Sequence, residues 1–379
     1  MYEINVQLEN GKRLVGLGEK AVFELYDPAH LHLAEAFIQD HAHDYVFIAV
    51  NYDLGHHFLG LSKTKPIGDF PLLRLWTAQE THIIDSYPAP ETSYKPENWN
   101  FRWQARETRE TYIKKVRLLQ QAIQQGNIYE INYCQEFFAE NVTEFPGKSI
   151  FDYLQLHTAN PFSVYWNSPQ WEVVSASPER FFKLQQQKLI SQPIKGTAPR
   201  SADPILDESI KETLRQDPKE RAENIMIVDL VRNDCSKIAE KNSVVVDELC
   251  AIYTFPFVHQ MISTVSCQVK PKIGFTDILK ALFPMGSMTG APKRSAVALS
   301  ETHETFSRGL YSSSIGYRAP NGDMDLNVMI RSFIFNKHKK QLSCPVGGAI
   351  TILSDPEKEY AECQTKVGKL LQLLGKCPW

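Results

Sequence analysis

Two stretches of this 379-residue chain each carry a pair of glutamates three positions apart. Glu220 and Glu223 lie in DPKERAENIMIVDLVRND (217–234), and Glu359 and Glu362 lie in SDPEKEYAECQTKVGKLLQLL (354–374). On a helix, residues three apart share one face. Each pair alone is also typical of a solvated acidic face near a helix N-terminus, where the helix dipole favours carboxylates. If the two faces converge, four carboxylates repel one another unless a hard cation lies between them, and the expected ion is Mg²⁺.

Lys195 lies in QPIKGTAPR, next to apolar Ile194 and followed by Gly196 and Thr197. It is either a surface charge beside a turn or a desolvated amine with a lowered pKa that acts as nucleophile or base, and the apolar neighbour alone does not choose between them. Gly196 and Thr197 would let a ligand approach the backbone and would offer N–H and hydroxyl donors to a carboxylate. Glu179, sixteen residues upstream, is at an expected turn and is either an ordinary turn glutamate or a general acid with a raised pKa.

The apolar pattern predicts the elements that must position these side chains. Helical spacing without an internal Gly or Pro predicts a helix over 217–234, and Ser354, Asp355 and Pro356 mark the start of a second helix. A further helix is predicted around 112–123, with Gly126 as its stop signal. Strand patterns cover 128–138, 163–166, 171–175, 180–184 and 189–194. Because these strands follow too closely for crossover helices, we expect largely antiparallel sheets with helices outside.

The N-terminal part shows a different pattern. Residues 1–87 are expected to form short strands and a helix over 28–41. The prolines Pro88, Pro90 and Pro96 cannot lie in a helix or a central strand, so they mark a crossing between two portions of the chain.

The composition excludes several classes of protein. With 43% hydrophobic residues, 22% charged residues and a net charge of −3, the chain is unlike disordered, collagen-like, coiled-coil or basic nucleic-acid-binding proteins. No apolar run approaches the roughly 20 residues that span a membrane, and the N-terminus lacks signal-peptide features, so we expect a cytoplasmic protein. The seven cysteines, odd in number and without a C-x-x-C pair, are expected to be reduced thiols.

Eight motifs follow one another along residues 105–375: SPERF (177–181), PIKGT (193–197), KERAENIMIVDLVRND (219–234), FPMGSMTGAPK (283–293), SIGY (314–317), NVMIR (327–331), VGGAI (346–350) and DPEKEYAECQTK (355–366). Together they resemble the chorismate-utilising enzymes, which include anthranilate, aminodeoxychorismate, isochorismate and salicylate synthases. Each motif alone is a weak signal, whereas the ordered set is specific. The resemblance implies a single α+β unit of two packed, largely antiparallel β-sheets flanked by outer helices.

The same resemblance divides the chain into a shortened N-terminal region, residues 1–100, and a chorismate-binding catalytic region, residues 101–379. We expect the two regions to form one intertwined structural domain. The N-terminal region shows no match to the segment that holds feedback tryptophan in anthranilate synthases, so we expect no such regulation.

The resemblance also implies a role for individual residues. Mg²⁺ would be held directly by Glu223 and Glu362 and through water by Glu220 and Glu359, and it would hold the ring carboxylate of chorismate. The other positions implied in substrate binding are Gly196, Thr197, Tyr311, Arg331, the backbone at Gly347, and Lys366. His259, in FVHQMISTV, matches an active-site histidine; from its setting alone it could equally be a core histidine on a strand.

Lys195 indicates which reaction the resemblance implies. In the family that the chain resembles, anthranilate synthases carry PIAGT at the position of residues 193–197, whereas aminodeoxychorismate synthases carry PIKGT. The implied reaction is the amination of chorismate to 4-amino-4-deoxychorismate in 4-aminobenzoate and folate biosynthesis. In it the Lys195 amine attacks ring carbon 2, Glu179 protonates the leaving hydroxyl of carbon 4, and ammonia adds at carbon 4 and expels the lysine. The 379-residue sequence contains no G-x-C-x-G motif of the kind that carries a glutaminase nucleophile, so we expect a separate glutamine amidotransferase subunit to supply the ammonia.

Two alternatives stay open. An isochorismate or salicylate synthase would add water in place of ammonia, and PIKGT argues against it. A catalytically silent chorismate-binding subunit would be expected to lack Glu179, Lys195 or the acidic pairs, and all are present. The chain departs from the family pattern at four positions: Glu130 replaces the usual glutamine of a G-x-x-x-Q-x-N strand, Ala349 ends a G-G-G or G-A-G turn, and Cys363 and Thr365 replace Thr and Asn.

Overall fold

Two ten-stranded sheets form the framework of the computed structural model, which describes residues 2–66, 68–85, 99–158 and 160–379. In the first sheet the strand order is β16-β8-β20-β19-β10-β9-β1-β2-β6, with β7 beside β8. In the second it is β13-β15-β12-β11-β18-β17-β4-β5-β3, with β14 beside β15. All pairings between the described strands are antiparallel, which confirms the predicted fold class.

The strands of the first sheet are β1 (Glu3–Gln7), β2 (Arg13–Leu17), β6 (Glu80–Ile84), β7 (Gln104–Ala105), β8 (Glu130–Ala139), β9 (Val164–Asn167), β10 (Trp171–Ser175), β16 (Gly290–Ala291), β19 (Ser332–Asn336) and β20 (Gln341–Ile350). Those of the second are β3 (Ala21–Leu25), β4 (Val46–Val50), β5 (Leu73–Thr77), β11 (Arg180–Gln185), β12 (Lys188–Gln192), β13 (Ile194–Pro199), β14 (Val245–Thr254), β15 (Val258–Gln268), β17 (Ser314–Arg318) and β18 (Met324–Asn327). Strands from the first hundred residues therefore contribute to both sheets. The proposed crossing at Pro88, Pro90 and Pro96 lies outside the described residues.

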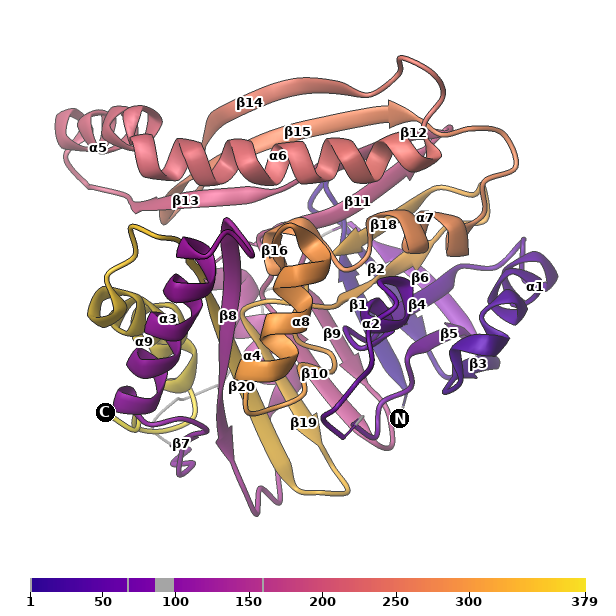
Figure 1. The fold of residues 1–379 in the computed structure, drawn as a ribbon. Helices are drawn as coiled ribbons and strands as arrows, with labels where there is room; N and C mark the ends of the chain where they lie inside the picture. Colours follow the sequence, from indigo (N-terminus) through magenta and orange to yellow (C-terminus); the bar gives the residue numbers. More distant parts are fainter. Residues whose placement is uncertain (1, 67, 86–98, 159) are drawn as a thin grey trace.

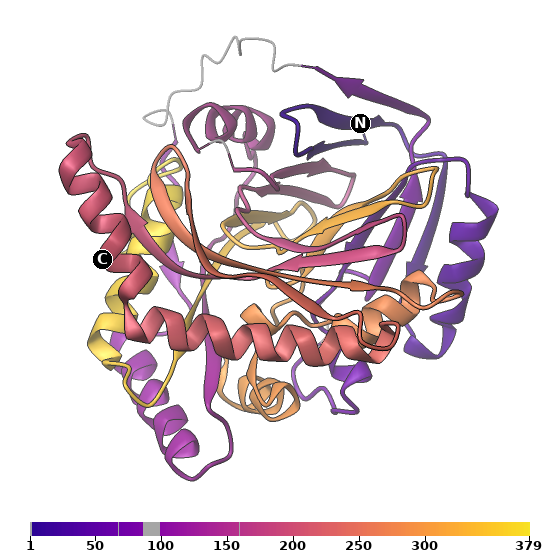
Figure 2. The same cartoon turned by 90° about the horizontal axis from the view of Figure 1, so that it is seen from above.

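The helices lie outside the sheets, as Figures 1 and 2 show. They are η1 (Pro28–His30), α1 (His32–Asp40), α2 (Leu54–Phe58), α3 (Arg109–Gln124), α4 (Gly147–Thr158), α5 (Pro204–Gln216), α6 (Pro218–Ile238), α7 (Phe275–Leu282), η3 (Gly286–Met288), α8 (Lys293–His303) and α9 (Pro356–Leu371). The long helix α6 runs beside β13, β14 and β15, and α3 and α9 pack together on β8 and β20 (Figure 1). Among the described residues, no helix combines the length and apolarity needed to cross a bilayer.

The two helices predicted to carry the acidic pairs are confirmed as α6 and α9. Each begins with a proline after an aspartate cap, Asp217 for α6 and Asp355 for α9. The two aspartate side chains accept hydrogen bonds from first-turn amides, which would otherwise lack partners. The helix expected over 28–41 is present as η1 followed by α1.

One strand prediction differs from the structure. The strand expected over 189–194 ends at Gln192 as β12, and β13 begins at Ile194. Pro193 lies between them, where a residue without an amide N–H ends the ladder. As a result, Lys195 lies within a strand at the edge of the second sheet and not in a turn.

The core has two parts. Apolar side chains from the facing sides of the two sheets fill the space between them, where Trp76 of β5 stacks on Trp166 of β9 with ring centroids 5.2 Å apart. A second apolar cluster lies between the first sheet and the helices α3, α4 and α9. Side chains alternate along β8, so that Tyr133 and Phe137 join the helix-side cluster while Cys134 faces the space between the sheets.

Candidate active site

Lys195 lies at an irregularity in β13. The pairing of β13 with β15 shifts register between Ile194 and Thr197, so Lys195 and Gly196 form a bulge. Such bulges re-aim side chains next to functional sites. Gly196 has a φ of +90°, and a Cβ there would meet the Glu220 carboxylate oxygen of α6 at 3.2 Å. The backbone conformation therefore favours glycine, and a larger residue would also crowd the Glu220 side chain.

The Lys195 side chain extends from β13 in the second sheet to a residue of the first sheet. Its Nζ lies 2.5 Å from Oε1 of Glu130, which opens β8. The Lys195 side chain is 10% exposed and that of Glu130 is 1% exposed. The amine is thus buried, as the nucleophile interpretation requires. Its pKa is raised and not lowered, because the charges of Glu130 and Glu223 outweigh the burial that disfavours an ammonium.

Glu179 lies directly before β11 and is 4% exposed. Burial raises the pKa of its carboxyl to about 7, although a hydrogen bond with Ser287 and the nearby charge of Lys195 act in the opposite direction. A carboxyl that is close to half protonated at neutral pH can donate a proton to a leaving group. Arg331 lies near enough for its charge to act on Glu179 as well.

The two acidic pairs converge. Lys219, at the start of α6, places its Nζ 3.8 Å from Glu223 Oε1 on the same helix and 3.7 Å from Glu359 Oε1 on α9. Burial raises the pKa of Glu220, and the charge of Glu362 on α9 adds to that effect. The faces that the sequence only suggested would meet therefore do so, with a lysine between them that the sequence reasoning did not consider.

The donor set fits a hard divalent cation. Oε1 of Glu223 is buried and accepts no hydrogen bond from the described residues. Burial raises the pKa of Glu223 to about 7, and the like charges of Glu130 and Glu220 contribute. No group of three His, Cys, Asp or Glu side chains in the described ranges is arranged to hold a metal by itself. In proteins, Mg²⁺ is commonly held by one or two carboxylates together with water and substrate.

The C-terminal part of the site joins α9 to β20. Lys366 Nζ lies 2.7 Å from Glu362 Oε1 and 3.3 Å from the carbonyl oxygen of Gly347. Although burial acts to raise it, the pKa of Glu362 is lowered overall by the adjacent Lys366. A Cβ at Gly347 would lie 2.7 Å from the sulfur of Cys134 on the paired strand β8. Gly347 and Lys366 thus lie beside Glu362, one of the expected metal-binding carboxylates of α9.

Three other expected site residues are less closely joined to this centre. Thr197 is exposed on β13, where its hydroxyl is free to meet a ligand. Burial lowers the pKa of Arg331, and its charge interacts with Glu179. Tyr311 is 2% exposed and its amide donates to the Arg308 carbonyl, but no hydrogen bond joins it to Arg331 among the described residues.

His259 lies on β15 and is 1% exposed. One ring nitrogen is 3.0 Å from Oδ1 of Asp207 on α5, and the other is 3.0 Å from the Thr254 hydroxyl. Both nitrogens are therefore used to join β15 to α5 and β14. In this conformation the ring faces α5 and makes no hydrogen bond to Lys195 or Glu179 among the described residues.

The departures from the family pattern are accommodated in the fold. Ala349 pairs with Asn132 in the β8–β20 ladder, and the Cys363 sulfur lies 3.4 Å from the Tyr112 hydroxyl. The Thr365 hydroxyl returns to the carbonyl of Ala361 within α9. Glu130 is the departure with a chemical consequence, because it places a carboxylate against Lys195.

Three site residues were not assigned from the sequence. Lys219 precedes the first acidic pair, and its i,i+4 spacing from Glu223 was a usable signal. Ser287, whose side chain hydrogen-bonds with Glu179, comes from the middle of the FPMGSMTGAPK motif and had no local signal. Asp207 lies 52 residues from His259 in the sequence, so only the fold reveals their contact.

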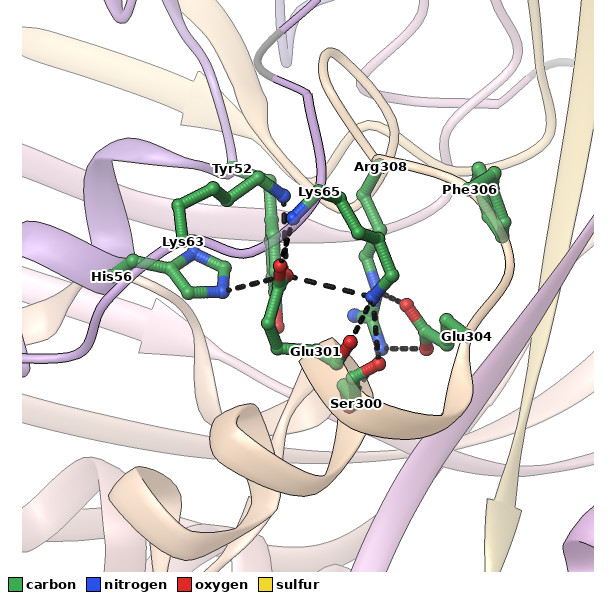
Figure 3. Close-up of a pocket in the computed structure, with 9 residues that line it drawn as sticks. All are labelled: Tyr52, His56, Lys63, Lys65, Ser300, Glu301, Glu304, Phe306 and Arg308. Atoms are coloured by element: carbon green, nitrogen blue, oxygen red, sulfur yellow. Dashed lines mark hydrogen bonds and ion pairs between the residues drawn. The ribbon is translucent and has the colours of Figure 1, made fainter.

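A second buried polar cluster lies apart from these residues, between the N-terminal region and α8 (Figure 3). Its cavity of about 10 Å³ has room for roughly one water molecule. Glu301 of α8 is its centre, with ion pairs to Lys63 at 3.2 Å and Lys65 at 3.5 Å and with His56 Nε2 at 3.3 Å. Because Glu301 is paired with both lysines of the segment 63–65, the cluster indicates a connection between chain segments.

Comparisons with known proteins agree with the motifs. The sequence pattern of the chorismate binding enzymes matches residues 5–372. Aminodeoxychorismate synthase component 1 of Escherichia coli (strain K12) is 39% identical over 276 residues, which is 72% of this chain. The chain covers 60% of the length of that relative.

Two solved structures share the fold. Anthranilate synthase component I from Streptococcus pneumoniae TIGR4 superposes with a TM-score of 0.78 at 21% identity, over 94% of this chain and 91% of that one. The menaquinone-specific isochorismate synthase of Escherichia coli gives a TM-score of 0.81 at 17% identity, over 99% and 89%. The family pattern covers nearly the whole chain, and the fold is the same from end to end, so this chain belongs to the chorismate binding enzymes.

Proposed function

We propose that this chain aminates chorismate to 4-amino-4-deoxychorismate, with Lys195 as the covalent nucleophile and Glu179 as the general acid. The observation that carries the proposal is a lysine side chain only 10% exposed, whose charge acts on the buried carboxyl of Glu179, the pKa of which is raised to about 7. The relatives named aminodeoxychorismate synthase support the assignment of the reaction.

The proposed chemistry uses side chains of this chain at each step. The Lys195 amine attacks ring carbon 2, the double bonds shift, and the bond from carbon 4 to its hydroxyl breaks while Glu179 protonates the departing oxygen to give water. Ammonia then adds at carbon 4, the double bonds shift back, and the lysine leaves carbon 2. The new ammonium at carbon 4 returns a proton to Glu179, which restores the general acid. Because the amine is fixed to the protein, proximity replaces a bimolecular encounter in the first step. The enolpyruvyl group is retained.

In this proposal, Glu223 and Glu362 hold Mg²⁺ directly, and Glu220 and Glu359 act through water. When bound, the ion neutralises the converging carboxylates and offers a positive centre for the ring carboxylate of chorismate. In the same proposal, Lys366, the backbone of Gly347 and Gly196, and the Thr197 hydroxyl help to bind that carboxylate. Arg331 supplies a two-donor fork for the second carboxylate of the substrate.

We further propose that a glutamine amidotransferase subunit supplies ammonia. The name "component 1" of the Escherichia coli relative supports a partner for that protein. At neutral pH free ammonia is mostly protonated and non-nucleophilic, so delivery from a docked subunit suits the second step. With glutamine as sole nitrogen donor, the purified chain should be inactive until the glutaminase subunit of the same host is added. Glutamine-dependent turnover by the chain alone would contradict this part of the proposal.

The reaction itself is tested with purified chain, chorismate, Mg²⁺ and ammonium. Chromatography with mass detection should show 4-amino-4-deoxychorismate as the main product, and a lyase added afterwards should convert it to 4-aminobenzoate. Anthranilate or isochorismate as the main product would refute the assignment. A chain that binds chorismate and makes no product would be the silent binding subunit.

A further inference from the structure

The Lys195 ammonium has one hydrogen-bond partner among the described residues, the Glu130 carboxylate at 2.5 Å. Both side chains are buried, and the second oxygen of Glu130 accepts no hydrogen bond from the described residues. This pair lies between the two sheets, because Glu130 opens β8 and Lys195 lies on β13. The amine is therefore held against a single carboxylate away from bulk water.

An ammonium has no lone pair, so Lys195 must lose a proton before it can attack carbon. Five other charged groups act on it or near it: Glu220 and Glu223 from α6, Glu362 from α9, Glu179 from the segment before β11, and Arg331 from the segment before β19. Glu179 must itself be protonated to serve as an acid, and Arg331 accepts no proton. Glu220, Glu223 and Glu362 are assigned to the metal in the proposed function. This leaves Glu130 as the acceptor in direct contact with the amine.

We propose that Glu130 takes the proton of Lys195 before attack and returns it after the lysine is expelled. The inference deepens the proposed function and rests on it. It gives Glu130 the part of a positioning residue and proton acceptor, since it acts on the substrate only through Lys195.

Over one catalytic cycle, the proton that Lys195 gives to Glu130 is returned to Lys195. Transfer from Lys195 Nζ to Glu130 leaves a neutral amine and a neutral carboxylic acid. The amine lone pair forms the bond to carbon 2, and the nitrogen then carries a positive charge. When ammonia adds at carbon 4, the bond to carbon 2 breaks and its electron pair returns to nitrogen, so the lysine leaves as a neutral amine. Glu130 gives the proton back and restores the resting ion pair.

The position of Glu130 also explains why the residue type matters. In the family pattern that the chain resembles, this position of the strand is usually a glutamine. Its amide can accept a hydrogen bond from the ammonium but cannot take its proton. Glu130→Gln is therefore close to isosteric and compatible with the fold, while it removes only the proton acceptor. Glu130→Asp keeps a carboxylate with a shorter reach.

Two measurements on Glu130→Gln separate proton transfer from simple charge pairing. The first is the acetylation rate of Lys195 by trace acetic anhydride, followed by peptide mass spectrometry on metal-free, substrate-free protein. Removing the carboxylate should raise the free-amine fraction, so labelling near neutral pH should increase several-fold. The second is the rate of chorismate adduct formation and of turnover with Mg²⁺ and ammonium. This rate should fall by about 10²-fold, the typical share of a general base, with little change in KM.

Glu107→Gln is the matched control, because Glu107 forms a buried ion pair of the same length, 2.5 Å, with Lys115 elsewhere in the chain. It should change neither the labelling of Lys195 nor its adduct formation. Glu130→Asp should recover part of the turnover that Glu130→Gln loses. A circular dichroism melt confirms that each variant is folded.

The proposal stands if the Glu130→Gln variant has a more reactive amine and a slower reaction. If both rates rise, Glu130 only holds the positive charge, and the inference is wrong. If neither rate changes, the contact has no chemical role and the inference is equally wrong. If the parent enzyme forms no adduct and no aminated product, the proposed function itself is wrong. If the parent is active and the Glu130→Gln variant is equally active, only the role of Glu130 is wrong.

Discussion

The Lys219 ammonium lies 3.8 Å from Oε1 of Glu223, between the two acidic pairs. The same nitrogen is 3.7 Å from Oε1 of Glu359, so one positive charge joins the helices α6 and α9. Although burial acts against the ammonium, these carboxylates raise the pKa of Lys219. A divalent cation that binds here must enter a space already influenced by this charge.

Lys219→Ala should therefore tighten Mg²⁺ binding. The lysine side chain is 41% exposed, so solvent screens its charge, and we expect an increase in affinity of about two- to fivefold. Isothermal titration with Mg²⁺ in the presence of chorismate measures it. Lys358→Ala, on an exposed residue of α9, is the control and should leave the affinity unchanged. Weaker binding in Lys219→Ala would show that the lysine helps to form the site.

Glu223→Gln should abolish Mg²⁺-dependent turnover, because it removes an anionic ligand whose Oε1 accepts no hydrogen bond from the described residues. Without metal, the variant should be as stable as the parent or more stable, since burial and like charges disfavour the ionised Glu223. Turnover against Mg²⁺ concentration and thermal melts in chelator measure the two effects. Glu357→Gln on the exposed side of α9 should match the parent in both. Near-normal activity of Glu223→Gln at limiting Mg²⁺ would remove this residue from the metal site.

The sequence predicted the elements of the site better than its contacts. Periodicity and aspartate–proline starts located α6 and α9, because these signals are local. The meeting of Glu130 with Lys195 depends on two sheets packed face to face, and no local pattern encodes that distance. The direction of the Lys195 pKa shift followed from the same contact, since burial alone would lower it. The bulge at Gly196 likewise depends on the register with β15.

The raised pKa of Glu179 predicts the alkaline limb of the pH profile. The general acid must be protonated, and burial raises its pKa to about 7, so kcat/KM should fall as the pH rises through about 7. Glu179→Gln should lower kcat by about 10²-fold or more. Ser287→Ala removes a hydrogen bond that lowers this pKa, and it should move the limb to higher pH. An unchanged limb in Ser287→Ala would assign it to another group.

Lys195→Ala should remove the covalent route. Rapid quenching and peptide mapping should find a chorismate-derived mass on the peptide that contains Lys195 in the parent and none in the variant. Any residual activity of the variant should be closer to that of an anthranilate synthase, because those enzymes carry alanine at this position, in the motif PIAGT. An adduct on another lysine would contradict the role given to Lys195.

Glu301 should contribute to stability and not to chemistry. Its carboxylate accepts hydrogen bonds from the Thr64 and Lys65 amides at 2.8 Å and 2.7 Å and pairs with Lys63, so it fastens the segment after α2 to α8 (Figure 3). Glu301→Gln removes the counter-ion of Lys65, while Lys63 keeps its ion pair with Asp53 at 2.9 Å, and we expect a loss of about 3 kcal/mol in the free energy of unfolding. Glu208→Gln, in an exposed pair with Lys211, should cost less than about 1 kcal/mol.

The pH dependence of that loss tests its cause. Burial acts to raise the pKa of Glu301, but the amides of residues 64 and 65 and the charge of Lys63 lower it to about 2. A depressed carboxyl pKa stabilises the fold fully above the unfolded value of about 4.3, and the contribution disappears as the pH falls toward 2. Urea titrations should therefore show the gap between parent and Glu301→Gln narrowing as the pH is lowered from about 7 to about 3. A gap that stays constant over this range would mean that the substitution acts through packing and not through the charge of Glu301.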